Sequence, residues 1–192
     1  METDSFKIFN LERHDTKDIT DKHVNGELTV IWRDWDNHEL VSPKMIYITS
    51  VKPNEKKGPH LHTKRNSFFT CIQGKVIFII KDGAGIYHEI EMSDSNPQLI
   101  FIPKNIPASH INVGKITAKI LALTDISWKP DSNEMKNVQF DDYEWKKWFS
   151  VLSIPMTTEE TATSSKKGEM IRIKSDVSSN LLSTGPKPKA KR

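Results

Sequence analysis

The chain has 192 residues, of which 36% are hydrophobic and 28% are charged, so it is long and apolar enough for one globular domain with a real core. Its single cysteine, Cys71, excludes a fold held together by disulfides, and its apolar neighbours favour a buried, inert thiol. No apolar run approaches the ~20 residues that span a bilayer, and the start METDSFKIFN lacks the pattern of a secretory signal. We therefore expect a cytoplasmic protein without a membrane partner.

The net charge of +3 is distributed unevenly along the chain. Residues 151–192 contain eight Lys or Arg and four Asp or Glu, whereas residues 1–150 contain twenty and twenty-one. A nucleic-acid-binding domain concentrates basic charge on a folded face, so we expect no nucleic-acid partner. Residues 151–192 also lack aromatic residues, and segments such as TTEETATSSKKGE cannot bury enough apolar surface to fold. We predict a folded domain over 1–150 and a polar, basic tail over 151–192, in which EMIRIKSDV (169–177) has the pattern of one edge strand.

Short β-rich runs separated by Gly, Pro, Asn, Asp and Ser follow one another through the first domain. Strands spaced about ten residues apart, with no long helical pattern among them, indicate an all-β sandwich or barrel. A short helix is expected within 129–150, an aromatic-rich segment that would cover one end of the barrel. The predicted strands are 27–35, 44–51, 67–72, 75–80, 85–92, 98–103, 109–113 and 116–125.

Two histidines stand two residues apart in the stretch GPHLHTKRNSFFTCIQG, which spans residues 58–74. In a strand, alternate residues project from the same face, so the imidazoles of His60 and His62 point into one space. This arrangement is compatible with proton transfer, with metal binding and with packing in a structural network.

The order Gly58, His60-x-His62, Gly74, Pro103 and His110 resembles the two sequence motifs of the cupin superfamily of small jelly-roll barrels. The stretch KPNEKKGPHLHTKRNSFFTCIQGKVIFIIKDG is similar to the RmlC-like branch of nucleotide-sugar epimerases and isomerases, and the resemblance covers roughly residues 27–148.

Two subfamilies of that branch differ at this motif. The dTDP-4-dehydrorhamnose 3,5-epimerases have Arg-Gly-x-His-x-Gln, and the dTDP-4-keto-6-deoxyhexose 3,4-ketoisomerases have Arg-Gly-x-His-x-His, where this chain has Lys57-Gly58-Pro59-His60-Leu61-His62. The ketoisomerase pattern also resembles this chain at Tyr47, at Lys52-Pro53, at Asp125 and at Asp142-Tyr143-Glu144-Trp145.

The resemblance implies a cupin jelly-roll barrel that isomerises or epimerises a nucleotide-linked 4-keto-6-deoxy sugar, in sugar or polysaccharide biosynthesis and without a cofactor. Carbons beside the ketone carry acidified C–H bonds, and an imidazole with an ordinary pKa of roughly 6.5 suits proton transfer there. By motif position His60 is the base, His62 moves a second proton or stabilises the enediolate, and Tyr47 is a proton donor. Asp125 is expected to orient the base. Residues expected to bind the substrate and its diphosphate are Lys56, Lys57, Arg65, Lys104 and His110.

Departures from the family pattern leave alternatives open. Asn66 and Ser67 stand where metal-binding cupins supply a Glu, so we expect no metal; a three-histidine site of His60, His62 and His110 is the alternative. The strand ILALTDISW lacks the Tyr residues that the epimerase pattern expects, so a non-catalytic sugar-binding cupin is a further alternative. The resemblance also implies a homodimer that exchanges N-terminal strands, with ELTVIWRDW (27–35) as the exchanged strand.

Overall fold

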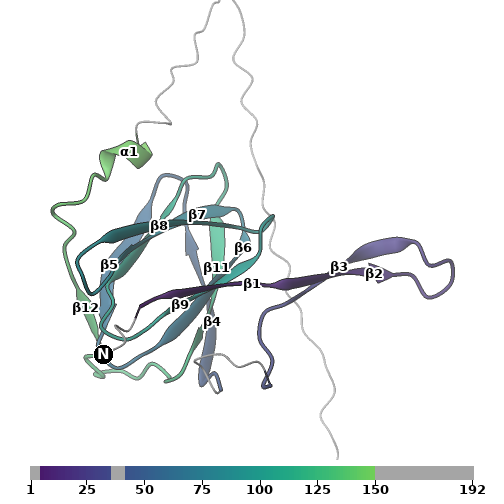
Figure 1. The fold of residues 1–192 in the computed structure, drawn as a ribbon, viewed down its shortest axis with the longest axis horizontal. Coiled ribbons are helices and arrows are strands. Elements are labelled where there is room, and N and C mark those ends of the chain that lie inside the picture. Colours follow the sequence, from purple (N-terminus) through teal and green to yellow (C-terminus); the bar gives the residue numbers. More distant parts are fainter. Residues whose placement is uncertain (1–4, 36–41, 150–192) are drawn as a thin grey trace, which may run out of the picture. The chain divides into compact units, whose positions relative to one another are not determined.

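The structure is a computed structural model, and it describes residues 5–35 and 42–149. Ten of the strands in these ranges form two five-stranded antiparallel sheets (Figure 1). The first sheet has the order β1 (Lys7–Asn10), β9 (Gln98–Ile102), β6 (Ser67–Gln73), β11 (Ala118–Thr124) and β4 (Met45–Val51). The second has the order β12 (Met135–Asn137), β5 (Lys56–His62), β10 (Ala108–Asn112), β7 (Lys75–Lys81) and β8 (Tyr87–Ser93).

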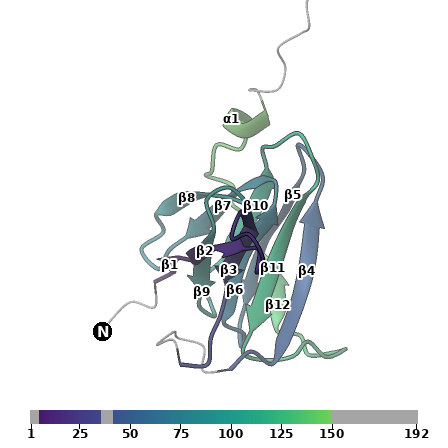
Figure 2. The ribbon, with the colours of Figure 1, turned by 90° about the vertical axis from the view of Figure 1, so that its right-hand side faces the viewer.

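The eight central strands pair in a nested order. In the first sheet β4 pairs with β11 and β6 pairs with β9; in the second, β5 pairs with β10 and β7 pairs with β8 (Figure 2). Nested antiparallel pairs that alternate between two sheets are the connectivity of a jelly roll. The all-β cupin fold predicted from the sequence is therefore confirmed.

The apolar run KVIFIIK of β7 is buried on both faces. Val76, Phe78 and Ile80 lie in the core between the sheets, which also holds residues of β6, β9 and β11. Ile77 and Ile79 face outward, where Phe140 and Tyr143 cover them. The segment that follows the barrel thus packs on the outer face of the second sheet, rather than on the barrel end, because β7 leaves apolar side chains there. It ends in the short helix α1 (Lys146–Phe149).

The N-terminal segments differ most from the sequence prediction. Strand β1 was not predicted, because its four residues, KIFN, are too few to show an alternating pattern. The strand forms by pairing with β9. The strand predicted at 27–35 is instead β3 (Val24–Val30), which pairs with β2 (Glu12–Lys17) in a hairpin that belongs to neither sheet (Figure 1). Residues on either side of this hairpin cover the outer face of the first sheet: Phe9, Leu11, Ile31 and Trp32 pack on Phe68, Leu99, Phe101 and Leu123.

Strands β5 and β12 were also absent from the predicted strands. The first contains Gly and Pro, and the second is a polar three-residue segment, MKN. The predicted tail over 151–192, with its strand at 169–177, lies outside the described residues. Within the described residues, no helix has the length and hydropathy of a membrane span.

Candidate functional site

A β-bulge in β5 sets the direction of the motif residues. Ala108 of β10 lies opposite His60 and His110 lies opposite Lys57, so β5 advances by three residues where β10 advances by two. The extra residue falls at Gly58–Pro59, and it lets Lys57 and His60 face the same cavity. Gly58 has a φ of 86°, and a Cβ there would lie 2.9 Å from the Ala108 carbonyl oxygen. This backbone conformation therefore requires glycine.

The cavity between the two sheets has a volume of about 230 Å³. Its walls are largely apolar, with polar groups from several strands converging on one space, which is the composition of a small-molecule site. The apolar lining comes from Phe69, Phe78, Ile102, Pro103, Ile106, Ala108 and Met135, and the polar lining from Tyr47, Thr49, Lys57, His60, His62, Arg65, Ser67 and His110.

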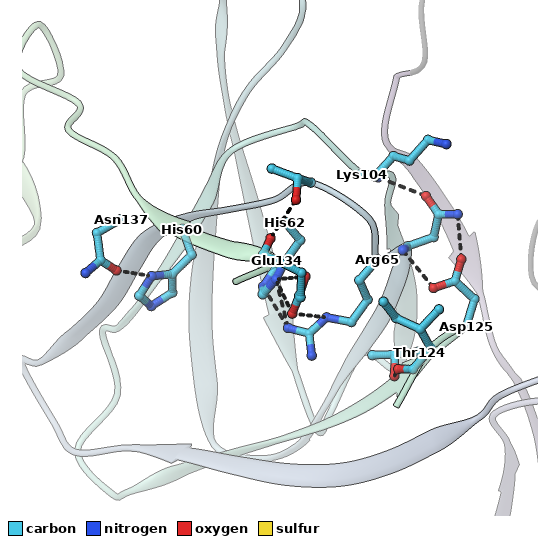
Figure 3. A network of polar contacts seen from close by, with 11 residues as sticks. His60, His62, Arg65, Lys104, Thr124, Asp125, Glu134 and Asn137 are labelled. Carbon is cyan, nitrogen blue, oxygen red and sulfur yellow. Dashed lines mark hydrogen bonds and ion pairs between the residues drawn. The ribbon is translucent and has the colours of Figure 1, made fainter. Parts of the chain in front are cut away.

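His60 has one polar partner among the described residues. Its Nδ1 lies 3.0 Å from Oδ1 of Asn137, the residue directly opposite it in the β5–β12 pairing (Figure 3). An amide oxygen only accepts hydrogen bonds, so Nδ1 donates and carries the ring proton in the neutral form. Nε2 then keeps the lone pair, which is the arrangement of a competent base.

His62 belongs to a different group of side chains. Its Nδ1 lies 3.0 Å from Oε2 of Glu134, and Nη2 of Arg65 lies 2.8 Å from its Nε2 (Figure 3). Glu134 is 3% exposed, and its Oε1 is 3.7 Å from Nε of Arg65. The carboxylate accepts from Nδ1 and the guanidinium donates to Nε2, so both ring nitrogens are engaged. Burial, followed by Arg65, lowers the pKa of His62 below its usual 6.5, while Glu134 opposes that shift.

Three further polar side chains line the cavity. Burial raises the pKa of the Tyr47 phenol above its usual 10.0, so it holds its proton at neutral pH. Burial, with smaller effects from Lys57 and His60, lowers the pKa of His110 to about 3, so its ring is neutral. Nε2 of His110 and Oγ of Ser67 are buried without a hydrogen-bond partner among the described residues. Buried polar atoms are normally paired, so these two are available to a ligand.

Asp125 does not lie beside the base. Its Oδ1 accepts from the Asn66 backbone N–H at 2.9 Å and its Oδ2 accepts from Nδ2 of Asn66 at 2.7 Å (Figure 3). It therefore fixes the loop that connects β5 to β6, and the carboxylate that contacts a histidine of the cavity is Glu134. Glu134 and Asn137 were not among the predicted site residues, because they lie 72 and 77 residues from their histidines in a polar segment with no motif.

Of the four basic residues expected to bind phosphate, two line the cavity and two do not. Lys57 lines the cavity and donates from Nζ to Oγ1 of Thr49 at 2.8 Å, and Arg65 lines it beside His62. Lys56 instead points to the outer face of the second sheet, where its Nζ lies 3.8 Å from the centroid of the Trp145 ring. Lys104 is exposed and does not line the cavity; its backbone N–H donates to Oδ1 of Asn66.

The alternative three-histidine metal site does not fit this geometry. All three histidines are in the described part of the chain, yet the ring nitrogens of His60, His62 and His110 do not all lie within 4.8 Å of one another. The Arg65 guanidinium against Nε2 of His62 also opposes a metal cation there. Asp18, Asp21 and His23, in the β2–β3 turn, are the described group that meets this distance.

Comparison with known proteins agrees with the jelly-roll architecture. Solved structures with a similar fold include a dTDP sugar isomerase from Desulfovibrio desulfuricans G20 (17% identity, TM-score 0.61, 72% of this chain and 87% of that chain). They also include a 3,4-ketoisomerase from Helicobacter canadensis (20% identity, TM-score 0.56, 76% and 96%). A third is a dTDP-4-dehydrorhamnose 3,5-epimerase from Elizabethkingia anophelis NUHP1 (14% identity, TM-score 0.60, 76% and 84%). At such identities the likeness shows the fold.

No curated protein matches the chain significantly. The family model described as WxcM-like, C-terminal (FdtA) matches residues 9–148, a range that contains both cupin motifs, the whole cavity and both partners of the histidines. Because that match spans well over half of the chain, the protein belongs to the WxcM-like, C-terminal (FdtA) family.

Proposed function

We propose that this protein is an isomerase that moves a proton on a nucleotide-linked 4-keto-6-deoxy sugar, with His60 as the general base. The observation that carries the proposal is that His60 and His62 lie in one cavity and that, of these two, His60 keeps a ring nitrogen without a partner among the described residues. His110 also has an unpaired Nε2, but burial holds its pKa at about 3, so it is a poor base. The substrate class is supported by the similar fold of a dTDP sugar isomerase and a 3,4-ketoisomerase.

The proposed reaction begins at the carbon beside the ketone. Nε2 of His60 takes the proton from C3, the C3–H electron pair forms a C3=C4 double bond, and the C4 oxygen accepts a proton from Tyr47. The Tyr47 phenolate then takes the proton of the C3 hydroxyl, which makes a ketone at C3, and C4 takes up the proton held by His60. Tyr47 is suited to the donor role because burial keeps its pKa above 10.0.

We assign Lys57 and Arg65 to binding of the substrate's diphosphate, and His62 to the oxygens of the sugar. The diphosphate of such a substrate requires basic partners, and Lys57 and Arg65 are the two expected cations that line the cavity. Movement of Arg65 onto an anion frees the lone pair on Nε2 of His62, which then accepts a hydrogen bond from the C3 hydroxyl of the enediol. A second histidine at this position, in place of the Gln of the 3,5-epimerase motif, favours 3,4-ketoisomerisation over 3,5-epimerisation.

Solvent exchange tests this function directly. The protein is incubated in D₂O with a dTDP-4-keto-6-deoxy sugar, and deuterium at each carbon is followed by NMR. His60→Asn should preserve substrate binding and lower the exchange rate by about 10²–10⁴-fold, the worth of a positioned general base. His62→Asn should also lower it, and His14→Asn, on the exposed strand β2, is the matched control and should not.

The position of exchange distinguishes the alternatives. Exchange at C3 with the carbonyl moving to C3 identifies a 3,4-ketoisomerase. Exchange at C3 and C5 with the ketone retained identifies a 3,5-epimerase and overturns the assignment of the ketone shift. Binding of the nucleotide sugar without exchange at either carbon refutes the enzymatic proposal and leaves a sugar-binding cupin.

We also propose that the protein is a homodimer. Strand β4 is an edge strand of the first sheet (Figure 2). Its Ile46 and Ile48 are 60% and 58% exposed, and they continue the apolar outer face formed by Leu123. Leu28 and Val24 are exposed on the β2–β3 hairpin, which pairs with no strand of either sheet. An unpaired edge with apolar side chains is a template for another chain, and the hairpin of a second copy supplies matching apolar residues.

Light scattering after size-exclusion chromatography tests the dimer. The wild-type mass should be twice that of the chain, and Ile48→Lys should give the single-chain mass. Ile86→Lys is the matched control, because Ile86 is equally exposed, at 58%, in the turn before β8. A monomeric wild type at micromolar concentration would disprove this proposal.

A further inference from the structure

Strand β12 is three residues long, and all three are exposed. It has no apolar pattern to dock it, yet it is held against β5 by a regular register: Met135 lies opposite His62 and Asn137 lies opposite His60. Backbone hydrogen bonds extend this pairing on both sides, from Thr63 to the Glu134 carbonyl at 2.7 Å and from Val138 to the Pro59 carbonyl at 3.2 Å. The backbone therefore fixes the Asn137 side chain beside Nδ1 of His60.

The chemical consequence concerns the tautomer of that ring. A neutral imidazole carries one N–H and one lone pair, and a base needs its lone pair on the nitrogen that meets the substrate. Oδ1 of Asn137, 3.0 Å from Nδ1 of His60, can only accept, so the proton stays on Nδ1. Without an acceptor at Nδ1 the ring is free to place its proton on Nε2, and the lone pair then faces away from the reaction.

We propose that Asn137 is a positioning residue that holds His60 in the Nδ1-protonated tautomer and so keeps its Nε2 basic. This inference rests on the proposed function, in which His60 removes the proton. Asn137 does this without adding a charge, whereas His62 has the buried carboxylate of Glu134 at its Nδ1. The two partners thus make the histidines chemically unequal: one ring presents a lone pair, and the other is bound at both nitrogens.

The tautomer is measured without substrate. Long-range ¹H–¹⁵N correlation spectra of protein labelled at histidine, recorded at a pH where the rings are neutral, assign the protonated nitrogen of each ring. We expect His60 of the wild type to carry its proton on Nδ1 and to lose that preference in Asn137→Leu. Asn137→Asp keeps an acceptor oxygen and should keep the tautomer. Lys136→Leu is the control, because Lys136 is exposed and lies opposite Leu61 instead of a histidine.

Kinetics then separate positioning from a structural role. Asn137→Leu should lower the exchange rate at saturating substrate by about 10²-fold, the cost of a misplaced catalytic group, with little change in KM. In the His60→Asn background, Asn137→Leu should not lower the exchange rate further, because the ring that Asn137 positions is no longer present. Asn137→Asp should be faster than Asn137→Leu.

Three results would overturn the inference. They are a wild-type His60 with its proton on Nε2, an unchanged tautomer in Asn137→Leu, or an equal loss of rate from Asn137→Leu in the wild-type and His60→Asn backgrounds. The first is read from the wild type and needs no variant to fold. Failure of the proposed function would appear differently, as a wild type with no exchange at C3 or C5, whatever its tautomer.

Discussion

Replacing Gly58 with alanine tests whether the bulge in β5 sets the direction of His60 and contributes to stability. The φ of 86° costs a residue with a Cβ about 1–2 kcal/mol. The new Cβ would also lie 2.9 Å from the Ala108 carbonyl oxygen and 3.0 Å from the His60 backbone nitrogen. Both neighbours are backbone atoms, so relief requires a shift of β5 against β10, which costs about 1–3 kcal/mol. We expect Gly58→Ala to lower the free energy of unfolding by about 2–5 kcal/mol.

Gly85 provides the matched control. Its φ is 83°, but the nearest heavy atom to a Cβ there is Cε of Lys81 at 3.9 Å, so Gly85→Ala has the backbone cost without the clash. Gly85→Ala should therefore lower the free energy of unfolding by only about 1–2 kcal/mol. In a domain of this size 1 kcal/mol corresponds to about 2–4 °C in Tm, so the variants should differ clearly in urea and thermal unfolding followed by Trp fluorescence.

The exchange assay completes this test. Because the clash involves the backbone of His60, Gly58→Ala should slow proton exchange at C3, and Gly85→Ala should leave it unchanged. Equal losses of stability in the two variants would show that the bulge accommodates a Cβ. That result would refute the reasoning that links Gly58 to the direction of His60.

Three further predictions concern titration and metal. Burial raises the pKa of the Cys71 thiol to about 11, so a thiol reagent at pH 8 should label Cys71 only after unfolding, and rapid labelling of the native protein would contradict its burial. Because the pKa of His110 is about 3 in the fold and roughly 6.5 when unfolded, the unfolded state binds more protons between these values and stability falls as pH drops through that window. Wild type should lose up to about 2 kcal/mol more than His110→Leu between pH 6.5 and 5 in urea unfolding, and equal losses would argue against a neutral His110. Chelators should leave the exchange rate unchanged, since the ring nitrogens of His60, His62 and His110 do not all lie within 4.8 Å of one another; loss of activity on chelation, restored by a d-block metal, would reverse this expectation.

Local pattern was sufficient for much of the barrel. The strands predicted at 44–51, 67–72, 75–80 and 98–103 coincide with β4, β6, β7 and β9, because alternating or continuous apolar residues bounded by turn formers are a property of neighbouring residues. The spacing of His60 and His62 likewise placed both rings in one cavity, since strand geometry alone puts alternate residues on one face.

The amino-acid sequence by itself determined the barrel, the motif and the histidine pair, and the tertiary structure decided which groups hold those histidines. Asp125 was the expected partner of the base, but it binds Asn66. Asn137 in β12 and Glu134 just before it reach the two rings from a segment that has no pattern of its own. Their contacts depend on the register between β5 and β12 and on the bulge at Gly58, which arise when distant strands pair. Periodicity reports which face a residue occupies, and the identity of its neighbour across the sheet exists only once that register is formed.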